Sequence, residues 1–377
     1  MTINPPTRLP QLRDSSRAML DGFDAGQLRR QSHPELSPLL WHVGHVFFVE
    51  TYWLAERVFG DTRTTDAWRD LYFPEMCAKE ARSTRLPDPD ALRAWSHDVS
   101  RTNDLYWQRA TDRDHPLLAQ GYLAAFIRQH YAQHLETMRL AAVQLRRREN
   151  PNPTANVIEP CAPAGTTHAV AAHRAEIGTE GIEAYDNEQP SFTTAVASFE
   201  VAAAPVSNAE WLGFMRAGGY DTPAFWDEAG WAWRQANRID HPEHWQRVGA
   251  HDWHIPTDTA GPIGEQPVHG INWFEARAFA RYAGARLPHE TEWEAAYRAG
   301  ALDGCHQVWE WCDNAFCPYA GFRAFPYDGY SRPWFDGRHM VARGGSYHTE
   351  IEIRRPGFRN FYPPTHRHIF AGLRLAR

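Results

Sequence analysis

The longest stretch with an unbroken helical period covers residues 116–148, and it constrains how this chain can fold more than any other segment. Its apolar residues recur every three to four positions, which predicts a helix of about thirty residues. Such a helix buries its apolar face by packing against other helices. Three further helical patterns precede it, at residues 11–23, 39–59 and 90–109. We therefore predict a four-helix bundle over residues 1–150.

The character of the sequence changes at Asn150-Pro151-Asn152-Pro153, where the long helical periods end. Residues 151–189 are interpreted as a linker with the first strands, and residues 190–377 as a compact α+β domain. Irregular loops held by buried Trp and Tyr are expected after Gly304. Within this second half the local patterns predict a strand at 192–201 and short helices at 207–217, 273–284 and 290–298.

Composition limits the class of protein. The chain has 377 residues, a net charge of −7 and five scattered cysteines. That charge argues against a general nucleic-acid binder, and no apolar run is long enough to span a bilayer. Residues 1–16 lack the apolar core of a secretory signal, and the cysteines do not form a disulfide framework. We expect a cytoplasmic protein that acts on small molecules, without nucleic acid, membrane or an obligate protein partner.

Histidines supply the main chemical signal. His130 and His134 are four residues apart in the longest helical pattern, so both imidazoles lie on one face. This spacing suits two nitrogen ligands of one metal ion, although two of 20 histidines can also fall four apart by chance. The segment at residues 39–59 offers a third imidazole from either His42 or His45. His45 shares a helical face with several aromatic residues, which predicts that it points inward.

Three neutral imidazoles could hold zinc, iron or copper. Zinc hydrolysis would need a nearby general base, and Glu136 lies on roughly the opposite side of the helix from His134. We therefore interpret Glu136 as a supporting carboxylate. Two other classes stay open on spacing alone: a non-catalytic binding module with a structural metal, and a zinc-dependent thiol transferase.

The second half carries five motifs in order: PVSNAEW, INWFEARAFARYAGARLPHETEWEAA, VWEWC, RGGSY and FAGLRLAR. This series resembles the formylglycine-generating-enzyme, or sulfatase-modifying-factor, domain over roughly residues 190–377, which implies a C-type-lectin-like fold. Formylglycine generation itself requires a cysteine pair soon after the motif RGGS, and no cysteine follows Ser346 here. Cys305, Cys312 and Cys317 precede the motif and are interpreted as structural.

The first half resembles the DinB-like bundle, through His45 in SPLLWHVGH and His130 and His134 in HYAQHLE. The fusion of the two domains resembles the ergothioneine-type sulfoxide synthases, the EgtB-like family. This resemblance implies non-haem Fe(II) bound by His45, His130 and His134. It also implies an O2-dependent reaction at imidazole C2 of N-alpha-trimethylhistidine. The sulfoxide synthases attach sulfur there, and a sister branch, the SenA-like selenoneine synthases, attaches selenium from a selenosugar.

The same resemblance suggests further site residues. Gln133 would contact the substrate imidazole, and the tyrosines of PYDGYSRPW would be catalytic, one supplying a proton or hydrogen atom. The residues of RNFY would bind the charged end of the substrate, where an aromatic face suits a trimethylammonium group. Tyr362 departs from relatives that have aspartate there. The catalytic pair is Tyr327 and Tyr330, and the RNFY residues are Asn360, Phe361 and Tyr362.

The chalcogen donor is predicted from two observations. Relatives that use gamma-glutamylcysteine bind its carboxylates with arginines, and Arg82 and Arg85 have a similar spacing in an irregular segment at residues 68–86. A solvated basic loop explains these arginines equally well, and the chain has no long insertions. We therefore predict a selenosugar donor, with gamma-glutamylcysteine or cysteine as the alternative.

Overall fold

A computed structural model describes residues 6–150, 152–163, 165–249, 252–257 and 259–377. The predicted boundary residue Pro151 and residues 1–5 of the N-terminal segment lie outside this described part. The chain forms two compact units. The first comprises Met1–Pro151 together with His348–Ile353, and the second comprises Asn152–Tyr347 with Arg354–Arg377.

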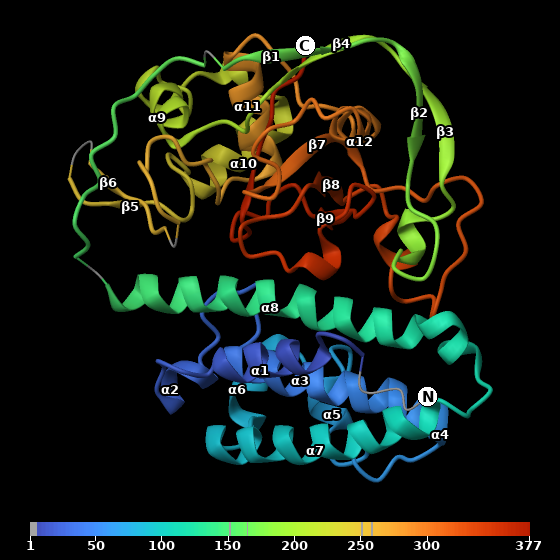
Figure 1. The fold of residues 1–377 in the computed structure, drawn as a ribbon. Coiled ribbons are helices and arrows are strands. Elements are labelled where there is room, and N and C mark those ends of the chain that lie inside the picture. The colour runs from blue at the N-terminus through green and yellow to red at the C-terminus, as the bar shows by residue number, and fades with distance from the viewer. Residues whose placement is uncertain (1–5, 151, 164, 250–251, 258) are drawn as a thin grey trace. The chain divides into compact units, whose positions relative to one another are not determined.

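The first unit is the predicted helical bundle (Figure 1). Helix α3 contacts α1, α7 and α8, and α8 also contacts α1. A π-helical turn, η1, and the short α4 follow α3 directly. The predicted helix at 39–59 is therefore continuous and contains one π-helical turn. The principal helices are α1 (Leu9–Ala18), α3 (Leu39–Thr51), α7 (Pro89–Ala110) and α8 (Tyr122–Glu149). The shorter ones are α2 (Ala25–Arg29), η1 (Tyr52–Glu56), α4 (Arg57–Phe59), α5 (Arg69–Tyr72), α6 (Lys79–Arg85) and η2 (Pro116–Gly121).

Helix α3 is the core of the bundle, and all thirteen of its residues are buried. Its sequence is apolar around the whole circumference, as expected for a helix with neighbours on every side. Its polar residues are His42, His45, Glu50 and Thr51, and Glu50, the one carboxylate, is fully buried. Its carboxylate accepts hydrogen bonds from Arg13 Nε at 3.0 Å, Trp107 Nε1 at 3.1 Å and Tyr131 Oη at 2.9 Å. One buried charge on α3 is thereby held by α1, α7 and α8 together.

A short segment from late in the sequence completes this unit. The turn η6 (Ile351–Ile353) contacts α8. Thr349 Oγ1 donates to Glu136 Oε2 at 2.7 Å, and Arg139 Nη2 donates to Glu350 Oε1 at 2.8 Å. Glu136 thus contacts a side chain of this segment.

The second unit contains a four-stranded sheet with strand order β10-β7-β8-β9 and three two-stranded ribbons (Figure 1). Strand β10 runs parallel to β7, and the other neighbours in the sheet are antiparallel. The sheet strands are β7 (Trp309–Ala315), β8 (Met340–Arg343), β9 (Asn360–Tyr362) and β10 (Ala371–Gly372). The ribbons pair β1 (Thr167–Val170) with β4 (Phe199–Ala202), β2 (His173–Ile177) with β3 (Phe192–Val196), and β5 (Gln246–Arg247) with β6 (Trp253–His254).

One expectation for this unit needs correction. The segment after Gly304 consists mostly of loops, as expected, and it also supplies the four short strands of the main sheet. The single strand expected at 192–201 is divided into β3 and β4, because the two halves pair with different partners, β2 and β1.

The helices of this unit follow their local signals. The predicted capping box at the start of α9 is present, since Ser207 and Glu210 bond each other's backbone N–H groups. Helix α10, capped by Asp227, was not predicted because its only buried residue is Gly230. The helices are α9 (Asn208–Arg216), α10 (Glu228–Asn237), α11 (Trp273–Tyr282) and α12 (Glu290–Arg298). The 3-10 turns are η3 (Asp186–Glu188), η4 (Pro223–Phe225) and η5 (Arg332–Trp334).

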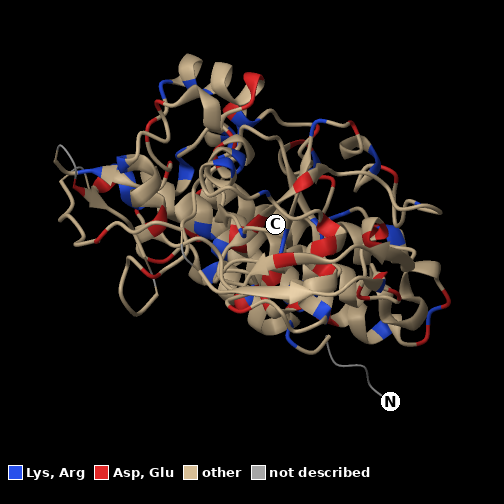
Figure 2. Ribbon diagram, turned by 90° about the horizontal axis from the view of Figure 1, so that it is seen from above, with Lys and Arg blue, Asp and Glu red and all other residues tan. Residues whose placement is uncertain are grey.

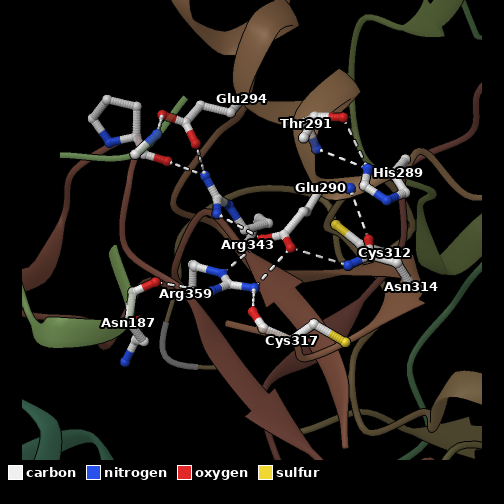
Figure 3. A network of polar contacts seen from close by, with 12 residues as sticks. Asn187, His289, Glu290, Thr291, Glu294, Cys312, Asn314, Cys317, Arg343 and Arg359 are labelled. Carbon is white, nitrogen blue, oxygen red and sulfur yellow. Dashed lines mark hydrogen bonds and ion pairs between the residues drawn. The ribbon is translucent and has the colours of Figure 1, made fainter. Parts of the chain in front are cut away.

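A buried ionic cluster joins α12 to the main sheet (Figure 3). Glu290 accepts two hydrogen bonds of 2.8 Å from Arg359, through Nε and Nη2, and one of 3.2 Å from Arg343 Nη1. Arg343 also donates to Glu294. The arginine of the RGGS motif therefore has a structural role in the second unit.

Basic and acidic residues are interspersed along the described chain (Figure 2). Among the described residues, none of the helices combines the length and apolar character that crossing a bilayer requires.

Candidate metal centre

Three histidines of the first unit converge. His45 on α3 and His130 and His134 on α8 each offer one ring nitrogen, and these nitrogens lie within 4.8 Å of one another. The i, i+4 spacing on α8 aligns two of the rings, whose centroids are 4.5 Å apart. The ring of His45 lies 5.2 Å from that of His130 and 4.6 Å from that of His134. This metal triad brings together the three histidines named from the sequence.

The backbone fixes the orientation of His45. Its Nδ1 lies 2.8 Å from the carbonyl oxygen of Tyr72, which can only accept a hydrogen bond. Nδ1 therefore carries the proton, and Nε2 keeps a lone pair for an ion. Trp41 stacks on the ring at 4.6 Å with an interplanar angle of 14°. Gly44 is required here, because a Cβ at that position would overlap the Tyr72 hydroxyl.

The environment keeps the triad uncharged. Burial lowers the pKa of His45 to about 4, and it lowers the pKa of His130 and of His134 well below the ordinary value. Neutral imidazole is the form that binds a metal ion. His130 Nδ1 is also buried without a hydrogen-bond partner among the described residues. Three neutral, convergent nitrogen donors fit a divalent transition metal such as iron.

The other residues predicted on the bundle have different environments. Gln133, one position before His134 on α8, is half-buried. Arg82 is buried, and the predicted irregular segment around it contains the helix α6. Its guanidinium donates to the Cys77 and Pro74 carbonyls at 3.0 and 3.1 Å and to Ser37 Oγ, and it lies 3.9 Å from the Trp41 ring centroid. Arg85 is exposed and donates to the Asp70 carbonyl at 2.9 Å.

The predicted catalytic tyrosines lie in the second unit, on the loop of residues 325–331. Tyr327 is exposed and Tyr330 is half-buried, and their ring centroids are 6.3 Å apart. Tyr330 stacks on the buried Tyr185 with a centroid distance of 4.5 Å. Burial raises the pKa of Tyr185, and a hydrogen bond from Tyr330 partly offsets that rise. Tyr185 was not identified from the sequence, because its contact with Tyr330 spans well over a hundred residues.

The turn η3 holds both ends of this tyrosine loop. Asp186 accepts hydrogen bonds from Ser331 Oγ and, at 3.4 Å, from the backbone nitrogen of Phe325. Asn187 Nδ2 donates to Ser331 Oγ at 3.0 Å. Burial raises the pKa of Asp186 to about 6, although these hydrogen bonds act in the opposite direction.

We expect this carboxyl to make stability depend on pH. Its pKa is higher in the folded chain than the ordinary 3.8, so the stabilising contribution is fully present below about pH 3.8. The contribution is lost as the pH rises through about 6. The unfolding free energy of the wild type, measured in urea relative to Asp186→Asn, should therefore fall as the pH rises from about 3.8 to about 6. A difference that stays constant with pH would contradict this role.

Strand β9 separates the predicted substrate-binding residues onto two faces. Successive side chains of a strand point to opposite faces, so Asn360 and Tyr362 share one face and Phe361 occupies the other. In agreement, Asn360 Nδ2 donates to Tyr362 Oη at 3.2 Å. Phe361 instead stacks on Phe316 with ring centroids 4.0 Å apart. The structure therefore places Asn360 with Tyr362 and separates both from Phe361, whereas the resemblance named the three residues together.

Comparison with known proteins covers both units. Residues 8–138 match the DinB superfamily, and residues 155–307 and 300–377 match the Sulfatase-modifying factor enzyme 1-like domain. The hercynine oxygenase of Mycolicibacterium smegmatis is 33% identical to this chain, and the similarity covers 94% of each protein. That of Mycolicibacterium thermoresistibile is 33% identical over 94% of this chain and 90% of its own. That of Mycobacterium tuberculosis is 32% identical, again with 94% of each covered.

Proposed function

This chain belongs to the hercynine oxygenase family, and from that membership we propose that it is a non-haem Fe(II) enzyme that uses O2 to attach sulfur to imidazole C2 of hercynine, N-alpha-trimethylhistidine. One structural observation carries the proposal: three neutral imidazoles converge to within 4.8 Å. Three protein ligands leave open positions on an iron ion, as an oxygenase requires. The similarity to hercynine oxygenases supports the sulfur alternative better than the selenosugar preference.

The reaction balances as a four-electron oxidation. The substrate loses its C2–H bond and the thiol loses its S–H bond, while a C–S bond and a sulfoxide S–O bond form. One oxygen atom of O2 enters the sulfoxide, and the other leaves as water. When bound by His45, His130 and His134, the iron would supply the activation of O2.

The chain's own residues would bind the substrates and move the protons. Gln133 would orient the hercynine imidazole, and the polar face of Asn360 and Tyr362 would bind its charged end. Tyr327 or Tyr330 would donate a proton or hydrogen atom. A phenol suits that task, because its O–H can donate while the ring packs against apolar neighbours. The stacking of Tyr330 on Tyr185, with ring centroids 4.5 Å apart, would limit the directions open to its side chain.

One observation favours a second candidate, the selenosugar donor. Donors that carry carboxylates call for exposed guanidinium groups, and Arg82 is buried with bonds to Cys77, Pro74 and Ser37. Arg85 alone would then meet a donor carboxylate. A neutral sugar does not require the pair.

A donor comparison tests both candidates. The iron-loaded protein is incubated with hercynine, O2 and one of gamma-glutamylcysteine, cysteine or selenoglucose, and product masses are measured. The sulfur proposal expects a sulfoxide conjugate with a thiol, and the selenium candidate expects a product only with selenoglucose. Product formation without O2 would support a zinc-dependent thiol transferase instead. No turnover with any donor would overturn the proposed enzymatic function and favour a binding module.

Tyr327→Phe and Tyr330→Phe are expected to bind metal as tightly as the wild type but to change the product or lower the rate. Each substitution removes one hydroxyl, and general acid catalysis typically contributes about 10²- to 10⁴-fold. Metal analysis and product masses, measured on the same preparations, check both expectations. Loss of metal from either variant would contradict a role limited to proton or hydrogen transfer.

A further inference from the structure

His42 is a fourth imidazole at the metal triad, and its side chain is buried. It precedes His45 by three residues on α3, and sequence spacing made it a rival for the ligand role. Its nitrogens are not among those that converge within 4.8 Å. Instead, His42 Nδ1 faces His134 Nδ1 at 3.2 Å, a hydrogen-bond distance. This contact places His42 directly behind one of the three ligands.

Two nitrogens at this distance require that one carries a proton and the other presents a lone pair. If His42 is the donor, His134 carries its own proton on Nε2, which then cannot bind a metal ion. If His134 is the donor, its Nε2 keeps the lone pair. We propose that His42 is the positioning residue that accepts the hydrogen bond from His134 and holds it in its metal-binding tautomer.

The proposal rests on the metal triad of the proposed function and extends it to a residue outside the ligand set. His42 is only 5% exposed, and one nitrogen of a neutral imidazole can accept a hydrogen bond. Two ligands then have a partner at Nδ1: His45 has the Tyr72 carbonyl, and His134 has His42. The carbonyl can only accept, whereas His42 can accept or donate. Metal binding therefore selects one of two proton arrangements at His42 and His134.

The accepting arrangement leaves a proton on His42 Nε2. That atom is buried and has no hydrogen-bond partner among the described residues. An unpaired buried donor is unfavourable, so the metal-free protein gains little from this arrangement. Binding of a metal ion to His134 Nε2 supplies the interaction that compensates for the unpaired proton on His42 Nε2. Partners of this kind behind a ligand typically contribute about 10- to 100-fold to metal affinity.

Two substitutions at His42 test the proposal. In His42→Asn the side-chain oxygen takes nearly the place of Nδ1 and can accept, whereas His42→Leu keeps similar bulk and cannot accept. Co(II) affinity of the full chain is measured by equilibrium dialysis. We expect His42→Leu to bind about 10- to 100-fold more weakly and His42→Asn to stay close to the wild type. His97→Leu, on the exposed face of α7, is the matched control and should bind as the wild type does.

A second measurement reports the tautomer directly. In the Zn(II)-loaded protein with 15N-labelled histidine, His134 Nδ1 should show a bonded proton, whose resonance loses its hydrogen-bond shift in His42→Leu. Metal-free thermal unfolding identifies any variant that does not fold. Equal Co(II) affinity of His42→Leu and the wild type would overturn the proposal, as would a His42→Asn variant as weak as His42→Leu. A wild-type chain that binds no metal would instead overturn the proposed function.

Discussion

His134→Ala is expected to lower the affinity of the chain for Fe(II) or Co(II) by more than about 100-fold. Even the loss of a partner behind a ligand costs about 10- to 100-fold, and this substitution removes a ligand itself. The other two histidines would remain within reach of the ion, but two imidazoles without a carboxylate form a weak site. Equilibrium dialysis followed by metal analysis of the protein measures the change.

Gln133→Ala is the matched control for this experiment. It alters the neighbouring position on α8 but no ring nitrogen of the triad. We expect it to keep wild-type metal affinity and to weaken hercynine binding. Because the side chain of His134 is only half-buried, its removal should leave the metal-free bundle folded. Wild-type metal affinity in His134→Ala would show that the ion binds elsewhere.

Glu50→Gln is expected to lower the free energy of unfolding of the first unit by about 3–5 kcal/mol, the usual cost of removing one partner of a buried ion pair. The substitution keeps the size of the side chain but leaves the buried guanidinium of Arg13 without its main counterion. It also weakens the acceptor for Trp107 and Tyr131. Urea denaturation followed by circular dichroism measures the change.

Asp14→Asn provides the control, because the Asp14 carboxylate is 75% exposed, although its partner Arg17 is buried. An ion pair with one exposed, solvated partner contributes about 0–1 kcal/mol, so this variant should unfold close to the wild type. If Glu50→Gln and Asp14→Asn have the same free energy of unfolding, the buried ion pair adds nothing measurable and the bundle depends on its apolar contacts alone. Metal affinity should fall with stability in Glu50→Gln, since α3 and α8 both carry ligands.

The bundle could be predicted because its signals are local. The apolar periods that bury α3, α7 and α8 are present in each segment separately, and the helices lie within a few residues of the expected positions. The main difference is the start of α8 at Tyr122. Gln120 and Gly121 have positive φ values there, so the chain breaks helical geometry between η2 and α8. The apolar period of residues 116–148, from which the helix was predicted, does not reveal that break.

The second unit was predicted less well because its strands depend on distant partners. Strand β10 has two residues and pairs with β7, about sixty positions earlier in the sequence. A two-residue strand has no period that could reveal it. The short helices were easier, since capping residues such as Ser207 and Asn272 mark their starts locally.

The candidate site was likewise predicted only where its signals are local in the sequence. Helical spacing named His130 and His134 correctly as neighbours, but it could not separate His45 from His42, since both are buried on α3. Only the fold shows His45 facing the other two rings and His42 behind His134. Spacing also suggested that Arg82 and Arg85 act as a pair. The structure places one guanidinium in the interior and the other in solvent, a difference that arises from tertiary contacts.

The segment His348–Ile353 has a consequence for how the protein is made. Domains generally fold in order as the chain leaves the ribosome, the N-terminal one first. Here the contacts of Thr349 with Glu136 and of Glu350 with Arg139 belong to the first unit. They cannot form until a segment 213 residues after Glu136 has been synthesised. The bundle that carries the histidines is therefore completed well after its own helices have been made, and cutting the chain after residue 150 would release it without its last segment.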